Sequence, residues 1–306
     1  MDLTPVILLV VFGLQQGITI GVAANGELIT EKAGILNIGI EGVMLTSAFF
    51  AAAVNFWLGK SLGGASAYVG LAAGMATGVG MNLILAFLAT KLHVDQVIAG
   101  IGINIFALGF TFAMLQGFFV LEGTPISNAI SPLFNIGGLT NGLAPKVSPL
   151  MPVLFVLPVV VYIFLNRTKF GLHIRAVGEN PKAAETAGID VVKTRIIATG
   201  LGGALLGLGG SYLTVDFFNS FTPDITAGIG FIALSAVIAG GWNPAYVLGI
   251  SILFGASVGL SFVLQVTGPE FYLISMLPYM MTVGVLGIAS KRLRPPSALA
   301  LPYQKE

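Results

Sequence analysis

Residues 5–24 decide the fold: they read PVILLVVFGLQQGITIGVAA and carry no charged side chain. A helix of about 20 apolar residues is long enough to cross the hydrocarbon core of a lipid bilayer. Acidic Asp2 precedes this run, whereas a secretory signal peptide begins with a basic stretch and has a shorter apolar core. We therefore expect residues 5–24 to form a first membrane span that is retained.

The composition of the whole chain agrees with a membrane protein. Of the 306 residues, 56% are hydrophobic and 9% are charged, whereas a soluble domain carries roughly 25% charged residues. The formal net charge of +1 provides no basic field that would attract nucleic acid. The chain contains no cysteine, which excludes disulfides, thiolate metal sites and cysteine nucleophiles. We expect an integral membrane protein with the lipid bilayer, and not nucleic acid, as its partner.

Long runs with little or no charge follow along the chain. They cover residues 33–58, 61–90, 96–121, 147–166, 196–215, 225–269 and 271–290. The 45-residue run is too long for one crossing, and it contains residues 240–244, GGWNP, a turn-forming cluster that divides it into two helices. The pattern predicts an all-α, polytopic membrane helical bundle of about nine segments, within a range of eight to ten. Residues 1–306 then form a single transmembrane domain.

Basic residues concentrate in two places. Six of the 14 Lys and Arg residues lie in the segment 167–195, and four more follow residue 290. Because Lys and Arg near span ends are retained on the cytoplasmic side, we expect both segments, and with them the C-terminus, to be cytoplasmic. Residues 122–146 then form an external loop, and counting spans backwards places the N-terminus outside.

Glycine recurs at four-residue intervals within several predicted spans. The series are Gly13, Gly17 and Gly21; Gly70, Gly74 and Gly78; Gly203 and Gly207; and Gly255 and Gly259. Small residues in this spacing line one helix face and allow two backbones to approach closely. The spans should therefore pack tightly, an arrangement that suits a transporter, a channel or a membrane enzyme equally.

Patterns that would indicate catalysis are incomplete. Residues 255–259, GASVG, match a nucleophile elbow but lie in the middle of a predicted span. Residues 59–61 resemble the end of a phosphate-binding loop, yet Val54 stands where that loop needs glycine. The two histidines, His93 and His173, lie in different predicted loops. We expect no catalytic residue, metal site or bound cofactor in this chain, so ATP hydrolysis would require a separate subunit.

Residues 170–190, FGLHIRAVGENPKAAETAGID, contain the local signals of a short helix. Asn180 is suited to cap it, Pro181 to occupy its first position, and Gly188 to end it. The pattern predicts an amphipathic helix that lies parallel to the membrane. This helix is either a structured connector or a docking helix for a cytoplasmic partner.

Four stretches resemble a known family. Residues 178–189, GENPKAAETAGI, and 230–244, GFIALSAVIAGGWNP, resemble the coupling loop and a late-span motif of bacterial ABC importer permeases of the sugar, nucleoside and branched-chain amino acid group. Residues 31–45, EKAGILNIGIEGVML, and 95–104, DQVIAGIGIN, resemble the nucleoside members that work with a basic-membrane-protein-type binding lipoprotein. The chain is thus similar to a type II-like ABC importer permease over residues 31–244.

The resemblance implies an ATP-driven importer in the bacterial cytoplasmic membrane. Two permease subunits, which we expect to be different chains, would form the path, and an external lipoprotein would deliver nucleosides. ATP and Mg would bind partner ATPase subunits. Simple sugars and branched-chain amino acids are the alternative cargoes. The residues expected to couple this chain to the ATPase are Arg175, Glu179, Asn180, Pro181, Lys182, Ala183, Ala184, Glu185 and Gly188.

Four polar residues are candidates for the translocation path: Asn37, Glu41, Gln96 and Asn104. Glu41 is the only charge well inside a predicted span, where a carboxylate costs about 2.5–3.5 kcal/mol. A proton, a substrate hydroxyl, or a hydrogen-bond network with Asn37 and a broken helix would offset that cost. Gln96 and Asn104 fall on one helix face, where they either bind cargo or tie helices together. A proton-coupled secondary transporter that uses Glu41 is the competing class of function.

Overall fold

The computed structural model describes residues 4–119, 128–130, 147–267, 272–289 and 294–304. Within these residues the regular elements are helices. In chain order they are α1 (Thr4–Lys32), α2 (Ile40–Leu62), α3 (Ala65–Thr90), α4 (Gln96–Phe119), α5 (Leu150–Arg167), α6 (Lys169–Glu179), α7 (Pro181–Thr186), α8 (Val191–Tyr212), the π-helical η2 (Leu213–Phe217), α9 (Ile229–Ala239), α10 (Pro244–Thr267), the 3-10 helix η3 (Tyr272–Met276) and α11 (Leu277–Ala289).

The described helices form a polytopic membrane bundle. Seven of them are long and apolar enough to span a bilayer, namely α1 to α5, α8 and α10. Two further apolar segments are shorter: α9, and the pair of η3 and α11. The long run is broken where the sequence predicted, because α9 ends at Ala239 and α10 begins at Pro244. The all-α, multi-pass architecture is thereby confirmed.

Two predicted boundaries are wrong. α1 does not end near Ala24 but continues for two more turns, so that Glu27 and Glu31 lie inside the helix. α8 begins before the predicted span and includes Arg195, which the charge pattern had placed in a cytoplasmic loop. In both places a helix continues past charged residues because, as shown below, other elements provide hydrogen-bond partners for them.

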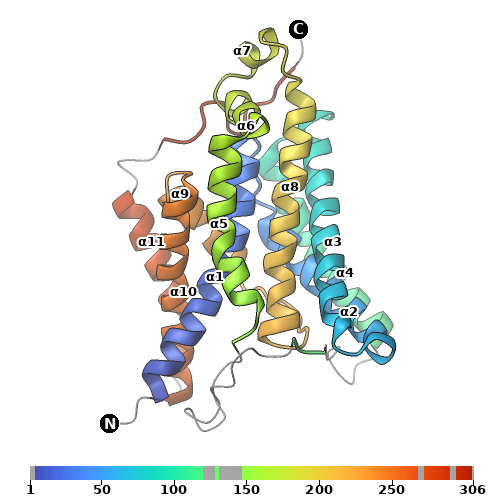
Figure 1. Ribbon diagram of the computed structural model, residues 1–306, viewed down its shortest axis with the longest axis vertical. Coiled ribbons are helices and arrows are strands. Elements are labelled where there is room, and N and C mark those ends of the chain that lie inside the picture. Colours follow the sequence, from blue (N-terminus) through green and yellow to red (C-terminus); the bar gives the residue numbers. More distant parts are fainter. Residues whose placement is uncertain (1–3, 120–127, 131–146, 268–271, 290–293, 305–306) are drawn as a thin grey trace.

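The bundle has two distinct ends (Figure 1). α6, α7 and the described part of the C-terminal tail, residues 294–304, lie at one end, and α1 begins at the opposite end. The described tail, which includes Arg294, therefore shares one end of the molecule with α6 and α7, which agrees with assigning them to one side of a membrane. Of the predicted external loop 122–146, residues 128–130 are described and the others lie outside the described residues.

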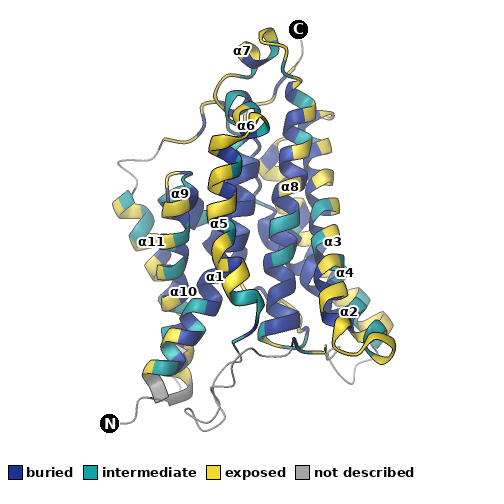
Figure 2. Ribbon diagram, in the orientation of Figure 1, coloured by how far each residue is buried: buried dark blue, intermediate teal, exposed yellow. Residues whose placement is uncertain are grey.

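α1 is the central helix of the bundle. It contacts α5, α8, α9 and α10, and residues 15–31 are buried without interruption. Figure 2 shows the contrast with α5 and α11, whose outer faces carry many exposed residues. Because those exposed side chains are mostly apolar, the outer faces suit contact with lipid or with another membrane subunit.

The seam between α1 and α10 is closed by glycine. A Cβ atom added to Gly17 would lie 2.9 Å from Cα of Ile252, and one added to Gly13 would lie 3.1 Å from Cα of Ala256. A Cβ atom on Gly255 would overlap the backbone of Gly17. The predicted glycine spacing thus allows backbone-to-backbone contact between the two helices.

Residues 33–39 join α1 to α2, and we call this segment the elbow. The elbow reverses the chain inside the protein, and its residues are buried or half-buried. Gly34 adopts a φ of +88°, a conformation that glycine reaches at little cost. Because a buried turn leaves backbone N–H and C=O groups without helical partners, the elbow needs hydrogen bonds from other elements.

Candidate functional site

Side chains of α4 hold the elbow. Gln96 Oε1 accepts a hydrogen bond from the backbone N–H of Leu36 at 2.7 Å. Asn104 Oδ1 accepts from the N–H of Gly42 at 2.7 Å, and its Nδ2 donates to the carbonyl of Ile38 at 2.9 Å. Both predicted path residues on α4 therefore bind backbone groups of the elbow and of the first turn of α2.

Asn37 connects the elbow to three helices. Its backbone N–H donates to Glu27 Oε1 at 3.1 Å, and its Nδ2 donates to Asn82 Oδ1 at 3.1 Å. Asn82 Nδ2 in turn donates to the carbonyl of Thr199 at 3.0 Å. All four residues are fully buried. This series of hydrogen bonds joins α1, the elbow, α3 and α8 across the interior.

Glu41 lies in the first turn of α2 and bridges to α9. Its Oε1 accepts from the N–H of Gly228 at 2.8 Å, and its Oε2 accepts from the N–H of Gly230 at 2.7 Å. The first N–H groups of a helix have no partner within the helix, and a carboxylate there also interacts favourably with the helix dipole. Of the three predicted ways to offset the cost of Glu41, the structure shows hydrogen bonds to a broken helix, which is α9, whereas Asn37 bonds to Glu27 and Asn82.

Glu27 and Glu31 correct the expectation that Glu41 is the only charge inside a span. They lie one turn apart on α1, and both are 0% exposed. Trp242 Nε1 donates to a carboxylate oxygen of Glu31. The sequence carried a signal for this extension, because residues 25–32 contain no proline and two acidic residues four apart share one helix face. The predicted end of the first span at Ala24 was based only on the end of the uncharged run.

Arg195 is the buried cation of this region, with 2% of its surface exposed. Its Nε donates to the carbonyl of Ala33 at the start of the elbow, at 3.1 Å. Its Nη1 donates to the carbonyl of Leu301 at 3.1 Å, and its Nη2 to that of Ala298 at 3.5 Å. The guanidinium group therefore fixes the C-terminal tail against the elbow.

Residues 297–303 of the tail, which we call the strap, cross the end of the bundle that carries α6 and α7. Ser297 Oγ donates to Glu179 Oε2 at 3.0 Å, and the N–H of Ala298 donates to the carbonyl of Gly178 at 2.9 Å. The strap thus binds the last turn of α6, immediately before α7.

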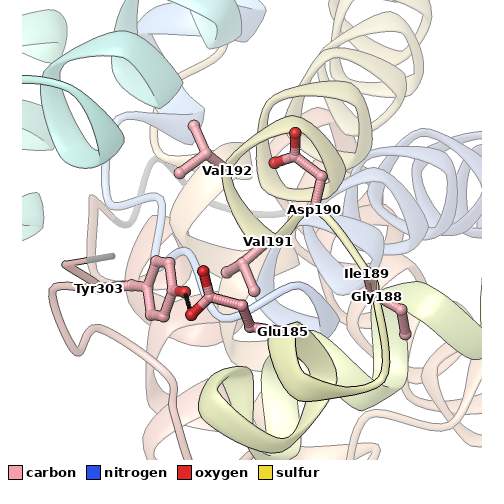
Figure 3. Close-up of a pocket in the computed structure, with 7 residues that line it drawn as sticks. All are labelled: Glu185, Gly188, Ile189, Asp190, Val191, Val192 and Tyr303. Carbon is pink, nitrogen blue, oxygen red and sulfur yellow. Dashed lines mark hydrogen bonds between the residues drawn. The ribbon is translucent and has the colours of Figure 1, made fainter. Parts of the chain in front are cut away.

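Tyr303 at the end of the strap binds the predicted coupling segment. Figure 3 shows its hydroxyl against the Glu185 carboxylate, to which it donates a hydrogen bond. The Tyr303 ring packs in a buried cluster with Ala184 and Val191, and its carbonyl lies 3.2 Å from His93 Nε2. A surface pocket of about 240 Å³ lies beside this contact. One tyrosine thereby links α7, α8 and the connection between α3 and α4.

α7 forms as its capping residues predict. Asn180 Oδ1 accepts from the N–H of Ala183 at 3.0 Å, and Pro181 occupies the first turn. Gly188 follows the helix with a φ of +84°. The helix ends at Thr186, two residues before Gly188.

The predicted coupling residues divide by exposure. Exposed are Glu179, Asn180, Lys182, Ala183 and Gly188; half-buried are Arg175, Pro181 and Glu185; and Ala184 is buried. Ala184 and Glu185 face the subunit's own helices and strap, so the outer face of α7 is formed by their neighbours. A role of the whole set in coupling stays a prediction.

Comparison with known proteins identifies the family. Residues 9–286 match the family described as branched-chain amino acid transport system / permease component. The chain belongs to this permease family. Because the match covers most of the chain, it includes the elbow, α7 and α9, while the whole strap lies beyond it.

Relatives of the permease extend over nearly its whole length. The guanosine ABC transporter permease NupQ of Bacillus subtilis is 34% identical over 298 residues, which are 92% of either chain. The nucleoside ABC transporter permease NupC of Lactococcus lactis is 30% identical over 293 residues, 92% of this chain and 91% of its own. TsgC13 of Haloferax volcanii, provisionally named a glucose ABC transporter permease, is 33% identical over 328 residues, 96% of either chain.

The permease is a multi-pass membrane transport subunit, and its polar contacts join the two predicted groups of residues. The structure brings all four path candidates to the elbow and the start of α2, and it connects the coupling segment to the same elbow through the strap and Arg195. The geometry therefore offers a continuous set of contacts between α7 and the centre of the bundle. Whether the four residues line the path stays a prediction.

Proposed function

We propose that this permease is the membrane-spanning subunit of an ATP-driven importer of nucleosides in the bacterial cytoplasmic membrane, with its C-terminus inside. A separate ATPase subunit that binds ATP and Mg docks on α7, and a second, different permease completes the path. An external lipoprotein delivers the cargo. The names of NupQ and NupC support nucleosides, and that of TsgC13 keeps a simple sugar as the alternative.

The geometry of α7 carries the proposal. α7 projects from the end of the bundle, next to the described tail (Figure 1). The exposed residues of α7 are Lys182, Ala183 and Thr186, and Ala187, which follows the helix, is exposed as well. The inner side of α7 is fixed, because Ala184 is 4% exposed and Glu185 is bonded to Tyr303. A short helix that is fixed on one side and exposed on the other is suited to pass a partner's movement into the bundle.

The first test is transport by vesicles that contain this permease with its cognate ATPase, second permease and binding lipoprotein. Labelled guanosine, glucose and leucine are offered separately, with and without ATP. We expect guanosine uptake that requires ATP and no uptake of the other two. Uptake that a proton gradient drives without ATP would contradict the proposal and favour a secondary transporter that uses Glu41.

The second test places a charge on the exposed side of α7. Ala187→Arg should lower ATP-dependent guanosine uptake about tenfold, which corresponds to about 1.4 kcal/mol of docking free energy. The amount of permease in the membrane should not change, because Ala187 is exposed. Ala65→Arg changes an exposed alanine at the first position of α3, a helix that begins at the end of the bundle opposite α7, and is the matched control. Equal uptake by both variants would remove α7 as the docking helix.

A further inference from the structure

A second cavity, of about 340 Å³, lies at the half-helix α9. Its walls come from α1, α9, α10, η3, α11 and the segment that precedes α9. The volume lies within the range of about 300–1,000 Å³ that is usual for small-molecule pockets. Because five helices and one loop contribute to it, the cavity is a property of the assembled bundle and not of one helix surface.

The lining of this cavity differs from that of a groove on α5. The groove on α5 is lined by Pro152, Val153, Val156, Leu157 and Val160, all of them apolar. Five side chains that line the α9 cavity carry an amide or a hydroxyl group: Gln16, Ser261, Gln265, Ser275 and Tyr279. Polar groups that face acyl chains are costly, because lipid offers no hydrogen bonds. The α5 groove therefore suits lipid, whereas the α9 cavity suits a polar ligand.

Several buried polar atoms of the described residues have no hydrogen-bond partner, and among the residues that line this cavity Gln16 carries one of them. Its side chain is 4% exposed, and its Oε1 has no hydrogen-bond partner among the described residues. A buried amide oxygen without a donor costs about as much as a lost hydrogen bond, so a ligand that supplies an N–H or O–H is favoured there.

The charges around the cavity select an uncharged ligand. Among the described lining residues none is charged. The N-terminus of a helix such as α9 normally attracts anions, but here the Glu41 carboxylate already accepts the N–H groups of Gly228 and Gly230. Tyr279 completes this wall by donating its hydroxyl to the carbonyl of Ala227 at 2.6 Å. A phosphate group or a zwitterionic amino acid would find no opposite charge.

We propose that this cavity binds the base of the transported nucleoside, an inference that rests on the proposed function. Phe218, Phe262 and Tyr279 line it and are between 41% and 47% exposed, so part of each ring is available for stacking, although Phe262 and Phe218 also contact the rings of Phe12 and Phe217. Stacking on aromatic side chains tolerates any base, because every base has a π-face. The amides of Gln16 and Gln265 supply polar groups for the edge of the base. A sugar alone would leave the aromatic walls without a matching flat surface.

The test is photolabelling of the assembled transporter, reconstituted in nanodiscs without the binding lipoprotein, by radiolabelled 8-azidoguanosine. We expect the label on peptides that contain Phe218, Gln265 or Tyr279 and not on residues 152–160. Excess guanosine and free guanine should both suppress labelling, whereas ribose should not. Labelling at other segments, or competition by ribose and not by guanine, would overturn the inference.

Two variants probe the amides. Gln16→Leu has nearly the same volume and should lower specific labelling about tenfold. Gln265→Leu changes an exposed residue, removes the hydrogen bond that Gln265 Nε2 donates to Ser261 Oγ at 3.1 Å, and should lower labelling about threefold. Val156→Leu in the α5 groove is the control and should label normally. Normal labelling of both glutamine variants would overturn the base site, even if vesicles import guanosine. Failure of guanosine uptake by the unmodified transporter would instead reject the proposed function.

Discussion

The seam between α1 and α10 and the elbow between α1 and α2 hold the same central helix by opposite means. At the seam, Gly13, Gly17 and Gly255 bring two backbones together because side chains are absent. At the elbow, buried amides, carboxylates and a guanidinium group bind backbone groups that would otherwise have no partner. The seam is therefore a packing contact that leaves no room for movement, and the elbow is a set of directional bonds.

This difference suggests how the permease moves. A seam in which glycine positions allow backbone-to-backbone contact has one close-packed arrangement. We therefore expect α1 and α10 to move as one body. Hydrogen bonds of the elbow and the strap can exchange partners, and they lie between α7 and the centre of the bundle. We therefore expect changes at the seam to prevent folding, and changes at the elbow and strap to affect stability less and transport more.

The largest effect is expected from Gly255→Val in the seam. A Cβ atom at this position would overlap the backbone of Gly17, so the two helices must separate. Overpacking usually costs about 1–3 kcal/mol, and a collision with backbone exceeds that range. Folded permease in the membrane should fall close to background, measured by size-exclusion chromatography of a fluorescent fusion. Gly249→Val on the same helix, where a Cβ atom meets nothing within 4 Å, is the control. Equal amounts of both variants would show that the seam is adaptable.

The seam and α7 were predictable from the sequence because their signals are local. Glycines four residues apart define the seam, and Asn180, Pro181 and Gly188 define the ends of α7 within nine residues. The elbow was not predictable in this way. Glu41 binds N–H groups that are 187 and 189 positions away, so no spacing indicates its partners. The same reason explains why the first span was ended too early: the cost of burying Glu31 is offset by Trp242, which is 211 positions away.

A smaller effect is expected from Arg195→Met at the elbow. Methionine fills similar space but cannot donate to the carbonyls of Ala33, Ala298 and Leu301. Loss of charge-assisted hydrogen bonds to these acceptors should cost about 2 kcal/mol and lower the Tm by roughly 4 °C. Thermal unfolding in detergent micelles measures this change.

Lys193→Met is the matched control for Arg195→Met. Lys193 lies two residues earlier on α8, is exposed, and carries the same charge. Its replacement should leave the Tm unchanged within about 1 °C, because exposed substitutions away from special features have small effects. A similar Tm for the two variants would mean that the guanidinium group does not hold the elbow to the strap.

The smallest change in stability, and the sharpest separation of stability from transport, is expected from Tyr303→Phe. The variant keeps the ring in its cluster with Ala184 and Val191 but removes the hydrogen bond to Glu185. One partly exposed hydrogen bond contributes about 1 kcal/mol, so the Tm should fall by roughly 2 °C. If the strap passes the movement of α7 to the elbow, the amount of guanosine imported per ATP hydrolysed should fall about threefold, while ATP hydrolysis continues. A threefold change corresponds to about 0.65 kcal/mol.

Tyr246→Phe is the control: it removes the hydroxyl of an exposed tyrosine on α10 and should change neither the Tm nor the ratio of transport to hydrolysis. An unchanged ratio of transport to hydrolysis in Tyr303→Phe would reduce the strap to a structural support.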